Sequence, residues 1–102
     1  MKKLDLLLNQ RIAENNIKEA TSIFMYKCDV TMTVTGFVSE VSYQVVRDYG
    51  YFLRKHKIYD NALIVFINMK IMLEKRGVEA GSELYAECDR NIREIKEELE
   101  QN

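Results

Sequence analysis

Hydrophobic residues recur every three to four positions along most of the chain, which is the spacing of one face of an α-helix. Asn16, Ser39 and Ser82 stand where they can cap the helices that follow them, and Gly36 and Gly77 stand where helices can end. The pattern therefore predicts an all-α fold of five antiparallel helices in a single domain spanning residues 1–102. The predicted helices cover residues 2–14, 17–36, 39–55, 59–76 and 82–100.

Residues 30–45 carry a second, competing pattern. Strict alternation of apolar and polar residues is typical of a half-buried strand, and β-branched residues favour it. An α+β fold with a β-hairpin near residues 30–45 is therefore the alternative prediction, and it would make the protein a small dimerising structural subunit. The apolar members of the alternation are Val30, Met32, Val34, Val41, Tyr43 and Val45.

A short phrase occurs twice in the chain. Ala20 and Phe24 recur 42 residues later as Ala62 and Phe66. A fixed period of this size is typical of stacked helical hairpins. Such stacks present extended surfaces that bind other molecules. The period predicts two units, at about residues 1–36 and 39–77, followed by a capping helix at about residues 82–100.

The second unit resembles a tetratricopeptide repeat. In that family, small residues let two antiparallel helices approach closely, and large residues fill the space beside the contact. The unit is 42 residues long rather than about 34, and its long second helix ends at a glycine, so it looks like the kinesin-light-chain variety. The small residues are Gly50 and Ala62, and the large ones are Leu53, Tyr59 and Phe66.

The resemblance implies about two and a half hairpins, with the first helix of each unit lining a shallow groove. Guanidinium and ammonium groups form charge-assisted hydrogen bonds with carboxylates, so a basic groove would suit an acidic or C-terminal peptide. The alternative is that these cations are solvated and paired in part with Asp48, Asp89 and Glu97. The residues implied for the groove are Arg47, Tyr51, Arg54, Lys55, Arg90, Arg93 and Lys96.

These observations predict a non-enzymatic protein–protein interaction module that acts as an adaptor, a chaperone or an assembly subunit. Two and a half repeats leave the outer helices uncovered, which predicts a homodimer or a subunit of a larger complex. The other candidate function is binding of single-stranded nucleic acid through the basic, tyrosine-bearing face. The net charge of −1 disfavours it.

Composition adds constraints on chemistry. The balance of 47% hydrophobic and 30% charged residues is that of an ordinary globular domain. Cys28 and Cys88 are far apart in the sequence and predict reduced thiols rather than a metal site. His56 is the single histidine, no glycine-rich phosphate motif is present, and the apolar run 62–73 is too short to span a bilayer. We expect no enzymatic activity, cofactor, metal or membrane association, and a cytoplasmic location.

Overall fold

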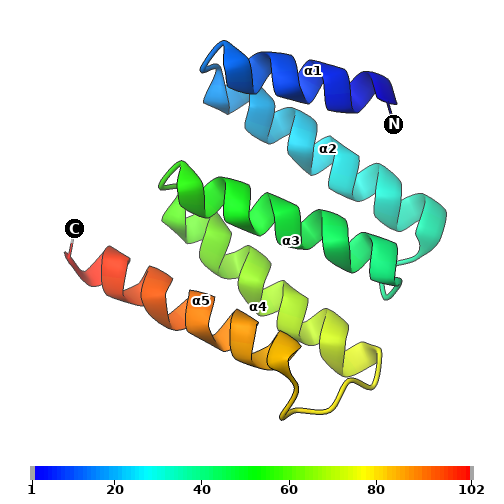
Figure 1. Cartoon of the computed structure of the whole chain (residues 1–102), viewed down its shortest axis with the longest axis vertical. Coiled ribbons are helices and arrows are strands. Elements are labelled where there is room, and N and C mark those ends of the chain that lie inside the picture. Colours follow the sequence, from blue (N-terminus) through cyan, green and yellow to red (C-terminus); the bar gives the residue numbers. More distant parts are fainter. Residues whose placement is uncertain (1, 102) are drawn as a thin grey trace.

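The computed structural model describes residues 2–101, and within them the chain forms five helices and no strand. Each helix packs against its neighbours in the sequence, and each runs back alongside the previous one (Figure 1). The terminal residues 1 and 102 of the predicted domain lie outside the described residues. The helices are α1 (Lys2–Ala13), α2 (Ile17–Thr35), α3 (Glu40–Lys55), α4 (Tyr59–Lys75) and α5 (Glu83–Gln101).

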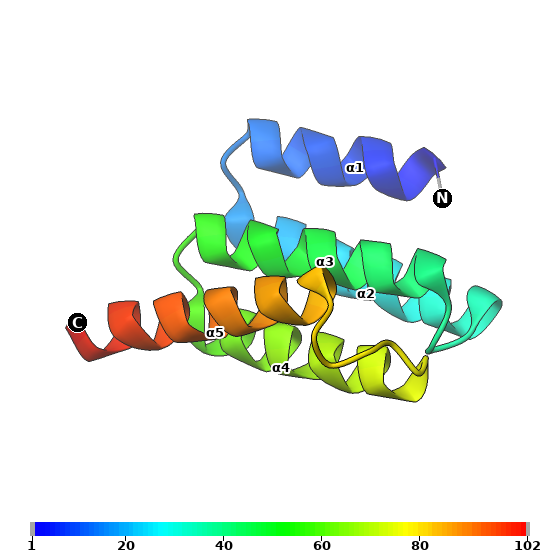
Figure 2. The same cartoon turned by 60° about the horizontal axis from the view of Figure 1, so that its bottom comes forward.

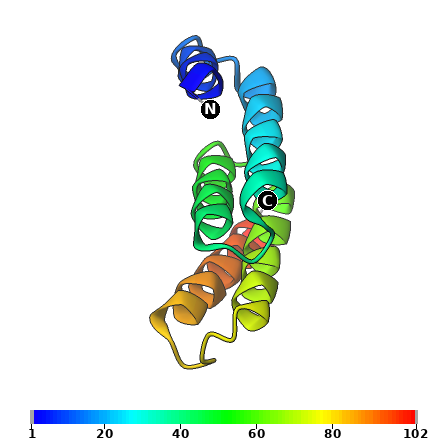
Figure 3. The same cartoon turned by 90° about the vertical axis from the view of Figure 1, so that its right-hand side faces the viewer.

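The helices form a thin, two-layered slab. Its extents are 39 × 38 × 16 Å. Helices α1, α3 and α5 lie in one layer and α2 and α4 in the other, as the edge-on view shows (Figure 3). A tilted view shows α5 crossing in front of α4 (Figure 2). A slab of two layers leaves both broad faces of the molecule open to a partner.

Most of the predicted helix ends are confirmed. The side chain of Asn16 accepts a hydrogen bond from the Glu19 amide at 3.3 Å, and Ser39 accepts one from Ser42 at 3.1 Å. Gly36 and Gly77 have φ angles of +92° and +76°, a region that favours glycine. The exception is Ser82: it directly precedes α5, but within residues 2–101 its hydroxyl oxygen has no hydrogen-bond partner.

The turns α1–α2 and α3–α4 share one geometry. Asn15 and Lys57 lie 42 residues apart, and both adopt left-handed conformations, with φ of 58° and 62°. The residue after each donates its amide to the carbonyl five positions back, at 2.8 Å for Asn16 and 2.9 Å for Ile58. This is the bond of a Schellman motif. The 42-residue period of the sequence is therefore also a period of backbone conformation.

The β-hairpin alternative for residues 30–45 is wrong, because α2 continues to Thr35 and α3 begins at Glu40. The threonines fit the helix by donating their hydroxyls to the carbonyl four residues earlier. Thr31, Thr33 and Thr35 make these bonds at 2.8, 2.8 and 2.7 Å. These bonds satisfy the hydroxyls within the helix but do not themselves favour it. Packing of α2 against α1 and α3 therefore outweighs the local strand propensity.

The residues of the repeated phrase lie in the core. Ala20, Ala62 and Phe66 are fully buried, and Phe24 and Leu53 are buried beside them. The tightest contact joins α3 to α4, where a Cβ added at Gly50 would lie 3.1 Å from the Phe66 ring and from Val65. A glycine here lets the two helices approach. Of the predicted repeat positions, Tyr59 is only partly buried.

Candidate functional site

Helices α3 and α5 meet through a ladder of charged and polar side chains. Arg47, Tyr51 and Arg54 are spaced four and three residues apart, so they share one face of α3. Glu87, Asn91 and Glu94 have the same spacing on α5 and face them. The ladder joins the last helix to α3.

Glu87 accepts the hydrogen bonds at the Arg47 end of this ladder. Arg47 donates to its carboxylate from Nη2 at 2.9 Å and from Nε at 3.2 Å, and the Tyr51 hydroxyl donates at 2.6 Å. The Arg47 guanidinium also lies 5.6 Å from the centre of the Tyr51 ring. A carboxylate with three donors is fixed in position, so Arg47 is committed to α5 in the free protein.

Asn91 links the middle of the ladder to its Arg54 end. It is fully buried, and its amide nitrogen donates to the Tyr51 hydroxyl at 3.0 Å and to the Glu87 carbonyl at 2.9 Å. Arg54 donates to the Asn91 side-chain oxygen at 2.6 Å and pairs with Glu94 at 2.8 Å. Every polar atom of this buried amide is satisfied, as buried polar groups require.

The contacts of the ladder shift the pKa of the Glu87 carboxyl. Burial acts to raise the pKa of its carboxyl, but hydrogen bonds from Arg47 and Tyr51 outweigh burial, and the pKa is lowered. The pKa of Tyr51 is raised by burial and by its bond to Glu87. The ionised form of Glu87 therefore stabilises the fold.

We expect the substitution Glu87→Gln to lower the free energy of unfolding at pH 7 by about 1 kcal/mol, because Arg47 is half exposed and its pair is screened. The stabilisation by ionised Glu87 is complete above the unfolded pKa of about 4.3 and is lost as the pH falls through the lower folded pKa. The difference in the free energy of unfolding between wild type and variant should thus shrink as the pH falls below the unfolded pKa. Urea denaturation across pH measures it.

Glu97→Gln is the matched control, because Glu97 is an exposed carboxylate on the same helix with no ion pair among residues 2–101. It should change stability little at any pH. A gap between wild type and Glu87→Gln that stays constant across pH would contradict the assigned role of the carboxylate.

Beside the ladder lies a charged hollow of about 540 Å³. Its lining includes Arg47 of α3 and Glu87 and Arg90 of α5. Arg90 is exposed and has no ion pair among the described residues, so it is the cation available to a ligand. The lining is completed by Glu83, Leu84 and Ala86.

The predicted groove is only partly brought together. Arg47, Tyr51, Arg54 and Arg90 lie at the α3–α5 junction, whereas Lys55 is exposed at the end of α3. Arg93 and Lys96 are four and seven residues after Asp89, so they lie on its side of α5. Asp89 pairs with Lys70 of α4 at 2.7 Å, which places that side away from the ladder.

The expected charge partners also differ. Asp48, Asp89 and Glu97 were candidates from the sequence, but Glu87 and Glu94 pair with the α3 arginines. The missed residues Glu87, Asn91 and Glu94 had a detectable signal: their spacing repeats that of Arg47, Tyr51 and Arg54 with complementary charge.

Nucleic-acid binding gains no support from this geometry. Stacking on bases needs an open aromatic face beside free cations. The Tyr51 ring instead packs edge-on against Phe66, with 5.3 Å between ring centres, and its hydroxyl is bonded to Glu87. Arg47 and Arg54 are both paired with carboxylates.

An apolar hollow of about 210 Å³ lies on the other side of α3. Its walls are Val30 and Val34 of α2 and Val41 and Val45 of α3. Val30 and Val34 follow Lys27, which pairs with Asp5 of α1 at 2.6 Å, on the same side of α2. The apolar hollow therefore lies on the same side of α2 as helix α1, further towards the C-terminal end of α2.

Other chemistry is sparse in residues 2–101. They contain no group of three or more potential metal-ligating side chains, and none of their helices is long and apolar enough to cross a bilayer. Cys28 and Cys88 are free and buried, and burial raises the pKa of the Cys28 thiol to about 12. Such thiols are unreactive near neutral pH.

No family model, curated protein or solved structure matches the chain.

Proposed function

We propose that the protein is a non-enzymatic interaction module built from about two and a half tetratricopeptide-like hairpins. Three features support this architecture: the 42-residue period of Ala20 and Phe24, the matching turns at Asn15 and Lys57, and the close approach of α3 and α4 at Gly50. The hairpins are α1–α2 and α3–α4, and α5 acts as the cap. An adaptor, a chaperone or an assembly subunit would use such a scaffold.

The observation that carries the functional proposal is the exposed Arg90 in the lining of the charged hollow. Arg90 has no ion-pair partner within residues 2–101, and Arg47 lines the same hollow, with its Nη1 group making no hydrogen bond among those residues. A ligand carboxylate between the two guanidinium groups would gain charge-assisted hydrogen bonds without breaking the ladder. The proposed ligand is an acidic peptide segment of another protein.

The apolar hollow beside Val34 and Val41 supports a peptide ligand further. It opens on the side of α3 opposite to the α5 ladder, so a chain crossing α3 would meet charge on one side and apolar surface on the other. Extended peptides gain affinity from apolar anchors and orientation from a few polar contacts. The preferred sequence would therefore combine acidic residues with an apolar one.

A peptide library displayed on phage and selected against the wild-type protein should enrich acidic peptides. We expect Arg90→Glu to lower the affinity for a selected peptide by at least about tenfold, since the substitution removes one ion pair and adds a charge repulsion. Arg93→Glu is the matched control, because it makes the same charge change on the α4 side of α5. Fluorescence anisotropy measures both.

Circular dichroism should show unchanged helicity in both variants, because neither arginine has an ion pair in the described part of the chain. Selection of no peptide, or equal weakening by the two variants, would contradict the proposed site. Arg47→Glu is not a clean test, since it would also disrupt the ladder to α5.

A further inference from the structure

The outward surface of α4 is apolar and carries no free charge over three turns. Ile64, Ile67 and Ile71 are 56%, 42% and 39% exposed. The one charged residue between Asn61 and Met72 is Lys70, and it pairs with Asp89 of α5. Single exposed apolar residues are common, but a contiguous patch of this kind marks an interface.

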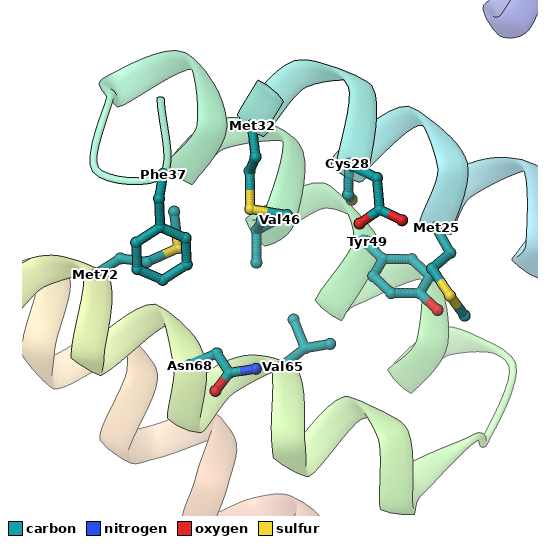
Figure 4. Close-up of a pocket in the computed structure, with 10 residues that line it drawn as sticks. Met25, Cys28, Met32, Phe37, Val46, Tyr49, Val65, Asn68 and Met72 are labelled. Atoms are coloured by element: carbon teal, nitrogen blue, oxygen red, sulfur yellow. The ribbon is translucent and has the colours of Figure 1, made fainter. Parts of the chain in front are cut away.

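A groove lies directly beside this ridge, between α2 and α4. Figure 4 shows side chains of α2, α3 and α4 pointing into it. Its cavity is about 150 Å³, and Met25 also lines the adjoining hollow next to Ile64. Methionine side chains adapt to the shape of an inserted group. We call it the methionine groove, lined by Met25, Met32, Met72, Val46, Val65 and Tyr49.

A ridge and a groove side by side on one face form a self-complementary surface. In an isologous dimer the same patch is used by both copies, so each ridge must find a groove on the other copy. Rotation about a two-fold axis over α4 brings the Ile64–Ile71 ridge of one copy towards the methionine groove of its partner. Ridges packed into grooves are the ordinary mode of helix contact.

The charges at the ends of α4 select an antiparallel arrangement. Asp60 lies at its beginning and Lys75 at its end, and neither has an ion-pair partner among residues 2–101. In an antiparallel pair of α4 helices, Asp60 of each copy meets Lys75 of the other. In a parallel pair, like charges would meet at both ends.

The polar residues within the ridge are also suited to an identical partner. Asn61 and Asn68 are seven residues apart, and so are Ile64 and Ile71, which gives the alternating three- and four-residue spacing of a helix–helix seam. Single asparagines in such seams fix the register. An amide both donates and accepts, so Asn68 can bond to its own symmetry mate near the two-fold axis.

We infer that the α2–α4 face binds a second copy of this chain, with the two α4 helices antiparallel across a two-fold axis at Asn68. The interface involves neither Arg90 nor the charged hollow, so it stands or falls independently of peptide binding.

Sedimentation equilibrium of the wild-type chain should show a monomer–dimer equilibrium. Ile64→Glu should weaken the dimer at least about thirtyfold, because it buries a charge within the interface, one helical turn from the two-fold axis at Asn68. Leu6→Glu is the matched control: Leu6 is 71% exposed on α1 and should leave dimerisation unchanged. A wild-type chain that remains monomeric at about 0.5 mM, or a dimer insensitive to Ile64→Glu, overturns the proposal.

A charge exchange tests the antiparallel geometry with variants that leave the core untouched. Asp60→Lys and Lys75→Asp should each weaken the dimer by about two- to tenfold, since each creates a like-charge contact twice per dimer. The double variant restores both pairs and should return to the wild-type dissociation constant. Additive weakening in the double variant overturns the antiparallel arrangement.

Discussion

Replacing Phe66 by alanine is expected to lower the free energy of unfolding by about 3–5 kcal/mol. The Phe66 side chain is fully buried, and its ring lies against Gly50 and edge-on to Tyr51. Because Gly50 has no side chain, it cannot fill the space that the ring leaves. Domains of this size are stable by about 5–15 kcal/mol, so the variant should be marginal. Urea denaturation followed by circular dichroism measures the change.

Phe37→Ala is the control for this prediction. Phe37 is 43% exposed in the α2–α3 connection, so its truncation should cost much less. A loss below about 1.5 kcal/mol for Phe66→Ala would mean that α3 and α4 collapse around the vacancy, contrary to a rigid contact at Gly50.

A second variant examines the same contact from the other helix. In the wild type, a methyl group at Gly50 would lie 3.1 Å from the Phe66 ring, so the ring must shift to admit it. In the Phe66→Ala background that ring is absent and only Val65 Cγ1, also at 3.1 Å, must still shift. The alanine gains up to about 1 kcal/mol of helix propensity, so Gly50→Ala should be better tolerated there than in the wild type. The effects of the two substitutions are therefore non-additive, as expected for residues in contact.

The helices of this chain are predictable from sequence because capping residues and apolar periodicity agree at most of their ends. Residues 30–45 are the exception, since the alternation of valine and threonine fits a strand as well as a helix. Packing of α2 against α1 and α3, with Thr31 buried in the core, decides for the helix. Hydroxyl bonds from Thr31, Thr33 and Thr35 to the preceding turn accommodate the threonines there. A local pattern contains neither of these effects.

The candidate site was less predictable than the fold. The spacing of Arg47, Tyr51 and Arg54 correctly placed them on one face, but it did not fix the rotation of α5 about its axis. That rotation depends on how Tyr85, Cys88 and Ile95 fill the core. It turns Glu87 and Glu94 towards α3 and turns Asp89, Arg93 and Lys96 away.

Enlarging the two repeated alanines should reveal whether the hairpins are equivalent in packing as well as in sequence. Ala20 and Ala62 are both fully buried. We expect Ala20→Leu and Ala62→Leu each to lower the free energy of unfolding by about 2–3 kcal/mol, because a close-packed core resists added volume. Leucine is nearly as good a helix former as alanine, so this cost is steric. Thermal and urea denaturation measure both.

Ala13→Leu is the control, since Ala13 is exposed at the end of α1 and should accept leucine with little change. The losses in the free energy of unfolding at Ala20 and at Ala62 are then compared with each other. The α3 helix, which packs against α4, carries Gly50, whereas the matching position of α1, 42 residues earlier, carries the larger, buried Leu8. If Ala20→Leu is tolerated while Ala62→Leu is not, the first hairpin is loosely packed. The repeated phrase would then mark one tight helix contact, and α1 would be the part of the slab most readily displaced.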